Sequence, residues 1–438
     1  MAGRIKQMIE EILAERSKGN EMLAGVIRTK LILKGINPEK YTEQSDDDPK
    51  IIRKLKKMTK EVSHGNQRPF MNIRTACSEK STAEGVVDEL MSIFSSNNMK
   101  MMIYFASAKF DPEEISARMQ MAFPGVTLFG CSTAGEIASG RLLKGSVVAM
   151  AFDEETLLDV KVEVVGNLRR KIDVGDAFRS IERHFGEAAD EMKPSQYLGI
   201  ILIDGMCGLE EKVMDAVGDK TNVIFLGGSA ADDLRFRKTF VFADGSSYAD
   251  AAVLAILKPA APFDLVKTQS VRAMGAELVV TKANEDKREI IEFNNKPASF
   301  AYAEALGVSI HELAACFPSN PLGLVIDGEP YIRSPTQISG DSVFFHCSSV
   351  EGMPLSLLEL TNLIEDTRDV LERSKAKLGG ISGVIVFNCA HRALELEFNK
   401  LSEKYGELFA EVPTIGFNSY GEQFIGHMNQ TATMIVFR

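Results

Sequence analysis

From about residue 70 to the end of the chain, short apolar runs alternate with amphipathic segments. The runs MMIYFAS (101–107), SVVAMAF (146–152) and GVIVFNC (383–389) have the length of buried strands, whereas 112–122 spaces its apolar residues as a helix does. This alternation predicts an α/β fold in which mixed β-sheets are covered by helices. The helices that we expect span 81–97, 112–122, 174–188, 209–217, 297–306, 354–378 and 390–405.

Residues 1–65 follow a different pattern. A helical repeat covers 4–17, a second helix is expected over 21–34, and a third follows Pro49. This stretch carries 14 Lys+Arg against 10 Asp+Glu, whereas the rest of the chain carries 36 against 51. We therefore predict a helical N-terminal module joined to the body by a linker at 66–70. It is either an appendage packed on the body or an element for homodimerisation or partner docking.

One polar motif occurs twice. The stretches GCSTAGE (130–136) and GFNSYGE (416–422) share the pattern G-x-[SN]-[ST]-x-G-E, and similar apolar and helical segments flank both. We infer an internal duplication, which predicts two related layered α/β domains at 70–292 and 293–438. Two glycines that bracket small polar side chains suit a tight turn. A polar turn repeated in two domains either lines a shared cleft or is inherited scaffold.

Composition restricts the functional classes. The chain has 438 residues, 45% of them hydrophobic and 25% charged, and its net charge of −11 disfavours binding to nucleic acid. No apolar run reaches the roughly 20 residues of a membrane span, and the charged start lacks the apolar region of a signal peptide. The six cysteines form no CxxC pair, which favours reduced thiols. We therefore expect a cytoplasmic protein without a membrane partner.

Both halves of the chain resemble the FIST family. GCSTAGEI, KGSVVAMAF, FLGGSAADDLRF and TFVFADG resemble its N-terminal half, and PLGLVIDGEPYIRSP, VFNCAHR and VPTIGFNSYGEQFIGHMNQTATMIVF resemble its C-terminal half. The resemblance covers about residues 70–438. It implies a sensory signal-transduction protein that binds a small, amino-acid-like ligand and acts through a partner such as a histidine kinase or a cyclic-nucleotide enzyme. Some relatives bind haem and respond to nitric oxide, so haem is an alternative cofactor, although none is required.

Asn388, Arg392 and Glu422 are the first candidates for ligand contacts. Asn388 and Arg392 lie where a buried strand runs into a helix, and ligands of α/β folds bind at the carboxyl ends of strands. Arg392 is suited to clamp a carboxylate and Glu422 to receive an ammonium group; alternatively, the two form an internal salt bridge. The other candidates lie in the motif turns and in the turn GGSAADD, where the alternative role is to cap backbone: Ser132, Thr133, Glu136, Ser229, Asp232, Asn418 and Tyr420.

Two further chemistries stay open at this point. Cys131 and Cys389 follow strands and are candidate nucleophiles of an enzyme, the alternative being that each is a small buried thiol. His346 and His391 lie beside apolar runs and are the candidate axial ligands if haem is bound. The sequence contains no HExxH or comparable ligand pattern, so we predict no metal site and no catalytic residue.

Overall fold

The computed structural model describes residues 3–17, 72–94 and 98–438 and isolated residues between 24 and 55. The isolated residues are 24–25, 28, 31–32, 36–42, 45, 48, 51–52 and 55. The linker that we expect at 66–70 lies outside the described residues.

The N-terminal module contains α1 (Arg4–Ser17) and the short helix η1 (Pro38–Lys40). The first expected helix is thus confirmed, whereas most of the second and third lies outside the described residues. A contact of 3.1 Å between the Arg28 guanidinium and the Asp327 carboxylate links the module to the body. Its expected part in homodimerisation stays a prediction. The buried apolar side chains of the module form a cluster of their own: Ile5, Met8, Ile9, Leu31, Ile36 and Leu55.

Within the described part of the chain, the body repeats one order of elements three times: leading strand, helix, first core strand, helical segment, second core strand, hairpin, closing strand. Unit A has β1 (Arg74–Ser78), α4 (Ala83–Ile93), β2 (Met99–Ser107), α5 (Pro112–Ala122), β3 (Thr127–Thr133), the hairpin β4 (Glu136–Ala138) and β5 (Arg141–Leu143), and β6 (Val147–Asp153). Unit B has β7 (Leu157–Gly166), α6 (Gly175–Phe185), β8 (Leu198–Ile203), α7 (Glu210–Gly218), β9 (Phe225–Ser229), the hairpin β10 (Val241–Ala243) and β11 (Ser246–Tyr248), and β12 (Ala251–Pro259). Unit C has β13 (Phe263–Gln269), α10 (Leu363–Leu378), β22 (Gly383–Cys389), α11 (Ala390–Phe398) with α12 (Ser402–Glu407), β23 (Thr414–Ser419), the hairpin β24 (Glu422–Phe424) and β25 (Gly426–Met428), and β26 (Thr431–Phe437).

The two motif copies occupy the same place in units A and C, so the duplication is confirmed. Unit B is a third copy that the sequence analysis missed. In units A and C the second core strand enters its hairpin through a two-residue turn, whereas in unit B a long loop lies between Ser229 and Val241. Because of this loop, unit B has no counterpart of the second glycine and the glutamate of the motif. Its sequence therefore does not match the pattern.

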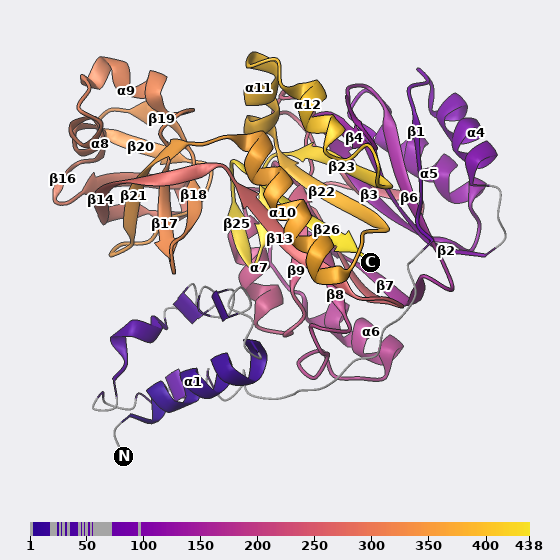
Figure 1. Cartoon of the computed structure of the whole chain (residues 1–438), viewed down its shortest axis with the longest axis horizontal. Coiled ribbons are helices and arrows are strands. Elements are labelled where there is room, and N and C mark those ends of the chain that lie inside the picture. Colours follow the sequence, from indigo (N-terminus) through magenta and orange to yellow (C-terminus); the bar gives the residue numbers. More distant parts are fainter. Residues whose placement is uncertain are drawn as a thin grey trace.

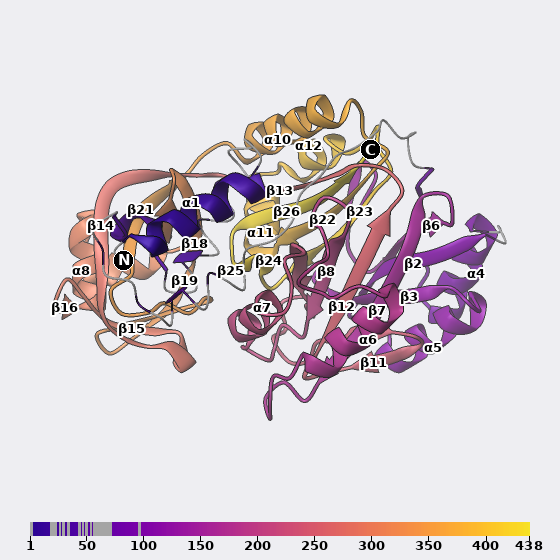
Figure 2. The same cartoon turned by 90° about the horizontal axis from the view of Figure 1, so that it is seen from below.

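Each unit lends its hairpin to the sheet of another unit. In every sheet of the body, the leading, closing, first core and second core strands of one unit lie side by side, and a hairpin from another unit completes the edge. The sheet of unit A takes β10 and β11 from unit B, that of unit B takes β24 and β25 from unit C, and that of unit C takes β4 and β5 from unit A. The core strands β2 and β3, β8 and β9, and β22 and β23 are parallel. This cyclic exchange ties the units into one body, with their strands gathered at its centre (Figure 2).

A glycine stands at the same position in all three second core strands. The register pairs Gly130 with Tyr104, Gly227 with Ile201 and Gly416 with Val386. A Cβ atom on these glycines would lie 1.7, 1.6 and 2.3 Å, respectively, from the carbonyl oxygen of the paired residue. The close approach of the strands excludes any side chain there, which explains why the first glycine of the motif recurs in unit B.

Unit C carries an insert between β13 and α10, at the end of the body opposite unit A (Figure 1). Its elements are β14 (Val271–Asn284), η2 (Glu285–Lys287), β15 (Glu289–Phe293), β16 (Lys296–Pro297), α8 (Ala298–Leu306), α9 (Ile310–Cys316), β17 (Leu322–Ile326), β18 (Glu329–Arg333), β19 (Pro335–Ser339), β20 (Ser342–Phe345) and β21 (Pro354–Leu360). The chain enters and leaves the insert side by side, because the Thr361 N–H donates to the Ser270 carbonyl at 2.8 Å. The expected boundary between residues 292 and 293 lies within β15, and as a division into domains it stays a prediction.

Two expected helices are wrong in part. The first seven residues of 354–378 form β21, which pairs with β14, and the helix begins only at Leu363. Asn362 caps this helix by accepting from the backbone N–H groups of Ile364 and Glu365. The helix expected over 390–405 is interrupted at Lys400, whose φ of 56° ends the first segment. The spacing of apolar residues reveals neither interruption. The first depends on pairing with a strand far away in the sequence, and the second depends on the backbone conformation of a single residue. None of the helices in the described residues is both long and apolar enough to span a membrane.

Candidate functional site

The motif turns of the three units contact one another in a closed ring. The Ser132 N–H donates to the Phe240 carbonyl of unit B, the Ser229 N–H to Gly421 of unit C, and the Asn418 N–H to Gly135 of unit A, at 2.8–2.9 Å. Return bonds of 2.9–3.1 Å run from the amides of Ala231, Tyr420 and Ala134 to the carbonyls of Ser132, Ser229 and Asn418. The polar motif groups therefore pair with each other, which favours the scaffold role for this ring.

Glu136 and Glu422 brace the start of the closing strand in their own units. Glu136 accepts from the Ser146 N–H and Oγ at 2.9 and 2.6 Å and from the Thr133 hydroxyl. Glu422 accepts from Ser419 Oγ at 2.6 Å and from Thr431 Oγ1 at 2.6 Å. Burial raises the pKa of Glu136 to about 7 and that of Glu422 to about 8, although these hydrogen bonds oppose the shift. In both units the carboxyl group thus connects the motif turn to the start of the closing strand.

Asp232 and Tyr420 hold the long loop of unit B. The Asp232 carboxylate accepts from the backbone amides of Phe236 and Arg237 at 2.8 and 2.7 Å, and Tyr420 donates its hydroxyl to the same carboxylate. The Tyr420 ring stacks on Phe236 with the ring centroids 4.6 Å apart. Burial opposes ionisation of Asp232, but the Tyr420 hydroxyl and the loop amides outweigh it and lower its pKa. The carboxylate therefore fixes the loop that unit B has in place of the tight turn.

Arg392 differs from the other expected site residues because, among the described residues, no carboxylate forms an ion pair or a hydrogen bond with its guanidinium. The charge of Arg392 only partly opposes the burial that raises the pKa of Glu395 and Glu422. It lies on the buried face of α11, directly after β22, and is 1% exposed. Its guanidinium donates to three neutral oxygens, those of Ser270 Oγ, Thr367 Oγ1 and Asn388 Oδ1, at 3.1–3.2 Å. Among the described residues it forms no ion pair, so the internal bridge to Glu422 considered above is not formed. Burying a cation among neutral groups is costly, and an anionic group bound there would offset that cost.

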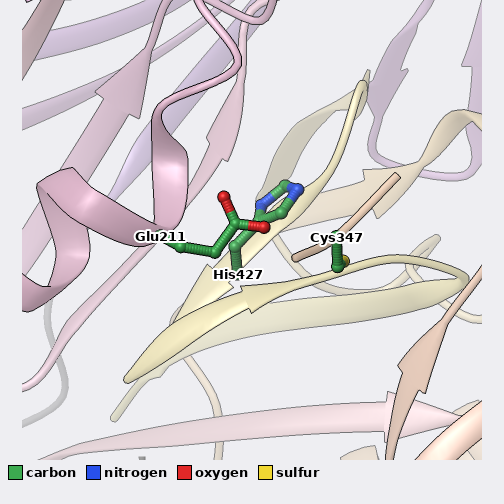
Figure 3. Close-up of side chains that lie close together, drawn as sticks. All are labelled: Glu211, Cys347 and His427. Atoms are coloured by element: carbon green, nitrogen blue, oxygen red, sulfur yellow. The ribbon is translucent and has the colours of Figure 1, made fainter. Parts of the chain in front are cut away.

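A second group of buried ionisable side chains lies where the insert meets the body. We call Glu210, Glu211, Arg288, Cys347 and His427 the junction cluster. Arg288 of the insert donates to the carboxylates of Glu210 and Glu211 in α7, at 2.5 and 2.6 Å. The cluster also includes Cys347, between β20 and β21, and His427 in β25. Glu211, Cys347 and His427 each offer one potential ligand atom, and these three atoms lie within 4.8 Å of one another (Figure 3). Unit B, unit C and the insert thus all contribute.

The surroundings of the junction cluster shift the pKa values of its members in different directions. Burial disfavours the Glu211 carboxylate, but the neighbouring His427 and Arg288 and the Ser348 amide outweigh it and lower its pKa. Burial lowers the pKa of His427, and the nearby glutamates oppose that shift. Burial raises the pKa of Cys347 to about 12. Strongly perturbed groups gathered at one place are typical of functional sites.

Sequence reasoning missed the junction cluster because its members are far apart along the chain. One signal was nevertheless present in the duplication. The hairpin of unit A pairs Ile137 with Leu142, whereas the equivalent pair in unit C is Gln423 with His427. Both Gln423 and His427 are buried. A polar pair that replaces an apolar pair in a buried hairpin points to a role specific to unit C.

The two alternative chemistries gain no support from the side chains that they invoke. Burial raises the pKa of both Cys131 and Cys389 well above the ordinary value, opposite to what an activated nucleophile needs. The His346 and His391 rings are in contact, with their centroids 4.9 Å apart, so no porphyrin plane fits between them in this arrangement. Burial, followed by the charges of His391 and His427, lowers the pKa of His346 to about 3. Haem therefore stays a prediction from the resemblance, and we derive no step through it.

Comparison with known proteins agrees with the order of motifs along the chain. The model of the FIST N domain matches residues 100–296, and that of the FIST C domain matches residues 298–425. An uncharacterized protein of Methanocaldococcus jannaschii is 24% identical over 360 residues, which cover 73% of this chain and 69% of that protein. The junction between the two matched domains falls within the insert, at the turn between β16 and α8.

Proposed function

This chain belongs to the FIST family, and we propose that it is a sensor that binds the carboxylate of a small, amino-acid-like molecule at Arg392. FIST domains are generally sensory signal-transduction domains. The observation that carries the proposal is the buried Arg392 guanidinium, whose hydrogen bonds within the described part of the chain all go to neutral oxygens. A carboxylate would form a charge-assisted, bidentate pair with it, a geometry that the planar guanidinium favours. Asn388, which bonds both Arg392 and Asn418, would orient the ligand.

Arg392 also contacts the root of the insert, which offers a path from binding to signalling. Its Nη1 donates to Ser270, the residue between β13 and the first strand of the insert. Ser270, Thr367 and Asn388 are all buried, so a ligand reaches Arg392 only when these groups move apart. Binding is therefore coupled to a change at the root, and a ligand that replaces Ser270 on the guanidinium frees the insert to shift.

The downstream partner, a histidine kinase or a cyclic-nucleotide enzyme, stays a prediction. We expect α11 to carry the signal to it. Arg392 occupies the buried face of this helix, whereas Leu394 and Phe398 are 43% and 88% exposed. An exposed aromatic side chain beside a second apolar one suits a protein contact. Replacing Phe398 with Ser should weaken the partner complex without altering the Kd for the ligand.

Calorimetric titration of the full chain with a panel of amino acids, their decarboxylated amines and simple carboxylates tests the proposal. A chelator is present throughout. We expect binding only of compounds that carry a carboxylate. Arg392→Met should weaken it by 30-fold or more, the equivalent of about 2 kcal/mol or more. Arg392→Lys should bind the ligand with an affinity between those of the wild-type protein and Arg392→Met. Lysine keeps the positive charge but lacks the planar guanidinium that pairs with a carboxylate through two hydrogen bonds.

Arg333→Met is the matched control, since Arg333 is also a buried arginine but lies in β18 of the insert and donates to backbone carbonyls. It should leave the Kd unchanged. Equal affinity of Arg392→Met and the wild-type protein contradicts the assignment of the site. Absence of binding across the whole panel contradicts the amino-acid-like ligand.

A further inference from the structure

Three side chains of the junction cluster offer donor atoms of three different kinds. Glu211 supplies a carboxylate oxygen, Cys347 a sulfur and His427 an imidazole nitrogen, and these atoms all lie within 4.8 Å of one another (Figure 3). Sulfur and imidazole nitrogen are ligands of zinc and similar transition metals, whereas magnesium and calcium take oxygen. In a tetrahedral zinc site, bonds of about 2.0–2.3 Å place ligand atoms roughly 3.3–3.8 Å apart. Small side-chain rotations would bring the three donors to that spacing.

Each donor is already positioned by a neighbouring group. The Ser348 N–H donates to Glu211 Oε1 at 2.7 Å, and Arg288 holds the other carboxylate oxygen. The Cys347 thiol donates to Asn429 Oδ1 at 2.7 Å, a bond that is given up when a metal replaces the thiol proton, and the His427 Nδ1 lies 3.2 Å from the Gln423 amide nitrogen. Metal ligands are typically oriented in this way by outer hydrogen bonds, which fix the ring of a histidine and the rotamer of a carboxylate.

The site also contains buried polar atoms that have no partner. Gln423, the neighbour of His427, is fully buried, and its Oε1 accepts no hydrogen bond from the described residues. Arg333 donates to the His427 carbonyl and is 5% exposed, and its Nε–H, which finds no acceptor in the described part of the chain, suits an anion or water at the fourth position of a metal. Leaving such a buried group without a partner is unfavourable. The motif ring, by contrast, pairs its polar groups internally, so the shortfall at the junction points to a bound group.

We propose that Glu211, Cys347 and His427 bind one divalent transition-metal ion of the zinc type. Binding would release the thiol proton of Cys347 to solvent and form a sulfur–metal bond in its place. Three protein ligands leave a fourth position for water or a small anion. Because the donors come from α7, from the insert and from β25, the ion would fasten the insert to the body.

A hollow on the insert is lined by Glu285, which is hydrogen-bonded to Ser348, the neighbour of Cys347 in the chain. The hollow has a volume of about 490 Å³ and an acidic rim that includes Glu285 and Glu351. Ser348 connects the two places, since its hydroxyl donates to the Glu285 carbonyl and its N–H to Glu211. An acidic entrance raises the local concentration of cations. The hollow would therefore concentrate cations close to the proposed ligands.

Cobalt(II) titration of the chelator-treated full chain tests the proposal, because cobalt reports its own ligands. We expect one equivalent to bind, with a thiolate-to-cobalt charge-transfer absorption and the visible bands of a tetrahedral ion, and zinc to displace it. Cys347→Ser should remove the charge-transfer absorption, and Glu211→Gln and His427→Gln should each weaken zinc binding at least 10-fold. Cys316→Ser, at a partly exposed thiol elsewhere in the insert, is the matched control and should keep the spectrum.

Two results would overturn the proposal. One is the absence of stoichiometric cobalt or zinc binding to the folded wild-type protein. The other is a charge-transfer absorption that survives in Cys347→Ser. The wild-type titration does not depend on any variant folding. It also requires no sensed ligand, so its failure is separate from a failure of the carboxylate site at Arg392.

Discussion

Units A and C have the same order of elements and the same motif, yet they differ where polar groups are buried. In unit A the hairpin is closed by the apolar pair Ile137 and Leu142, whereas unit C has Gln423 and His427 there. Three residues past the end of its first core strand, unit A carries the buried, apolar Phe110. Unit C carries the buried Arg392 instead. The comparison distinguishes the framework of strands and hairpins, which all units share, from the buried polar side chains that occur at these positions in unit C.

The same comparison explains why the motif itself is a poor guide to the site. Its glycine allows two core strands to approach, its Ser and Asn residues close the ring between units, and its glutamate braces the closing strand. These roles are needed in every unit that has a tight turn, so the motif recurs whether or not a ligand binds nearby. Residues that differ between the copies are the better candidates for function.

The largest effect that we predict tests whether unit B is built like the other two. Gly227→Ala would place a Cβ 1.6 Å from the Ile201 carbonyl oxygen and should destabilise the protein by about 3 kcal/mol or more, as should Gly130→Ala. Urea unfolding followed by circular dichroism measures this. Gly166→Ala is the control, because a Cβ there meets nothing within 4 Å. If Gly227→Ala is as stable as this control, unit B does not share the strand packing.

The next prediction sharpens the likeness between the glutamates of units A and C. Their pKa values, about 7 for Glu136 and about 8 for Glu422, lie above those of an unfolded chain, so the folded state holds the protons more tightly. Their contribution is complete below about pH 4.5 and is lost as pH rises through 7 to 8, by roughly 3 kcal/mol for Glu136 and roughly 5 kcal/mol for Glu422. Glu422→Gln and Glu136→Gln should each flatten the fall of Tm between pH 5 and about 8.5.

Glu113→Gln, at an exposed position of α5, is the control for this series and should keep the wild-type slope. Glu422→Gln can still accept from Thr431 and donate to Ser419, so its effect reports the charge and not a lost contact. A variant with the full wild-type pH dependence would show that the carboxyl groups ionise freely in the folded protein.

The smallest effect concerns the difference between the units at Arg392. Without ligand, Arg392→Met should be as stable as the wild-type protein or more stable by up to about 2 kcal/mol, because an apolar side chain of similar size removes an uncompensated buried charge. Asn388 Oδ1 keeps the Tyr405 hydroxyl, and Thr367 keeps its bond to the Leu363 carbonyl. Lys80→Met, at an exposed position of unit A, is the control and should change stability by less than about 0.5 kcal/mol. A loss of several kcal/mol in Arg392→Met would make its guanidinium a structural group.

The pattern of apolar residues was sufficient to predict most of the elements. The helix expected over 112–122 has these bounds in the structure, and the runs at 101–107, 146–152 and 383–389 are strands. The Asp-Gly pair at 327–328 is a sequence signal of a tight turn, and it joins β17 to β18 as a hairpin with both residues at positive φ. These features depend on interactions between residues close in sequence, and such interactions leave a period or a turn signal in the sequence itself.

The amino-acid sequence by itself thus determined the α/β class, the family and the repeated motif of this protein. Only the tertiary structure decided that there are three units, that their hairpins are exchanged, and that Glu136 and Glu422 are already bonded within their own units. It also decided that Arg392 lacks an anion and that Glu211, Cys347 and His427 converge. The physical reason is that a buried polar group is satisfied by whichever segment the fold brings beside it, and no periodicity along the chain records that neighbour.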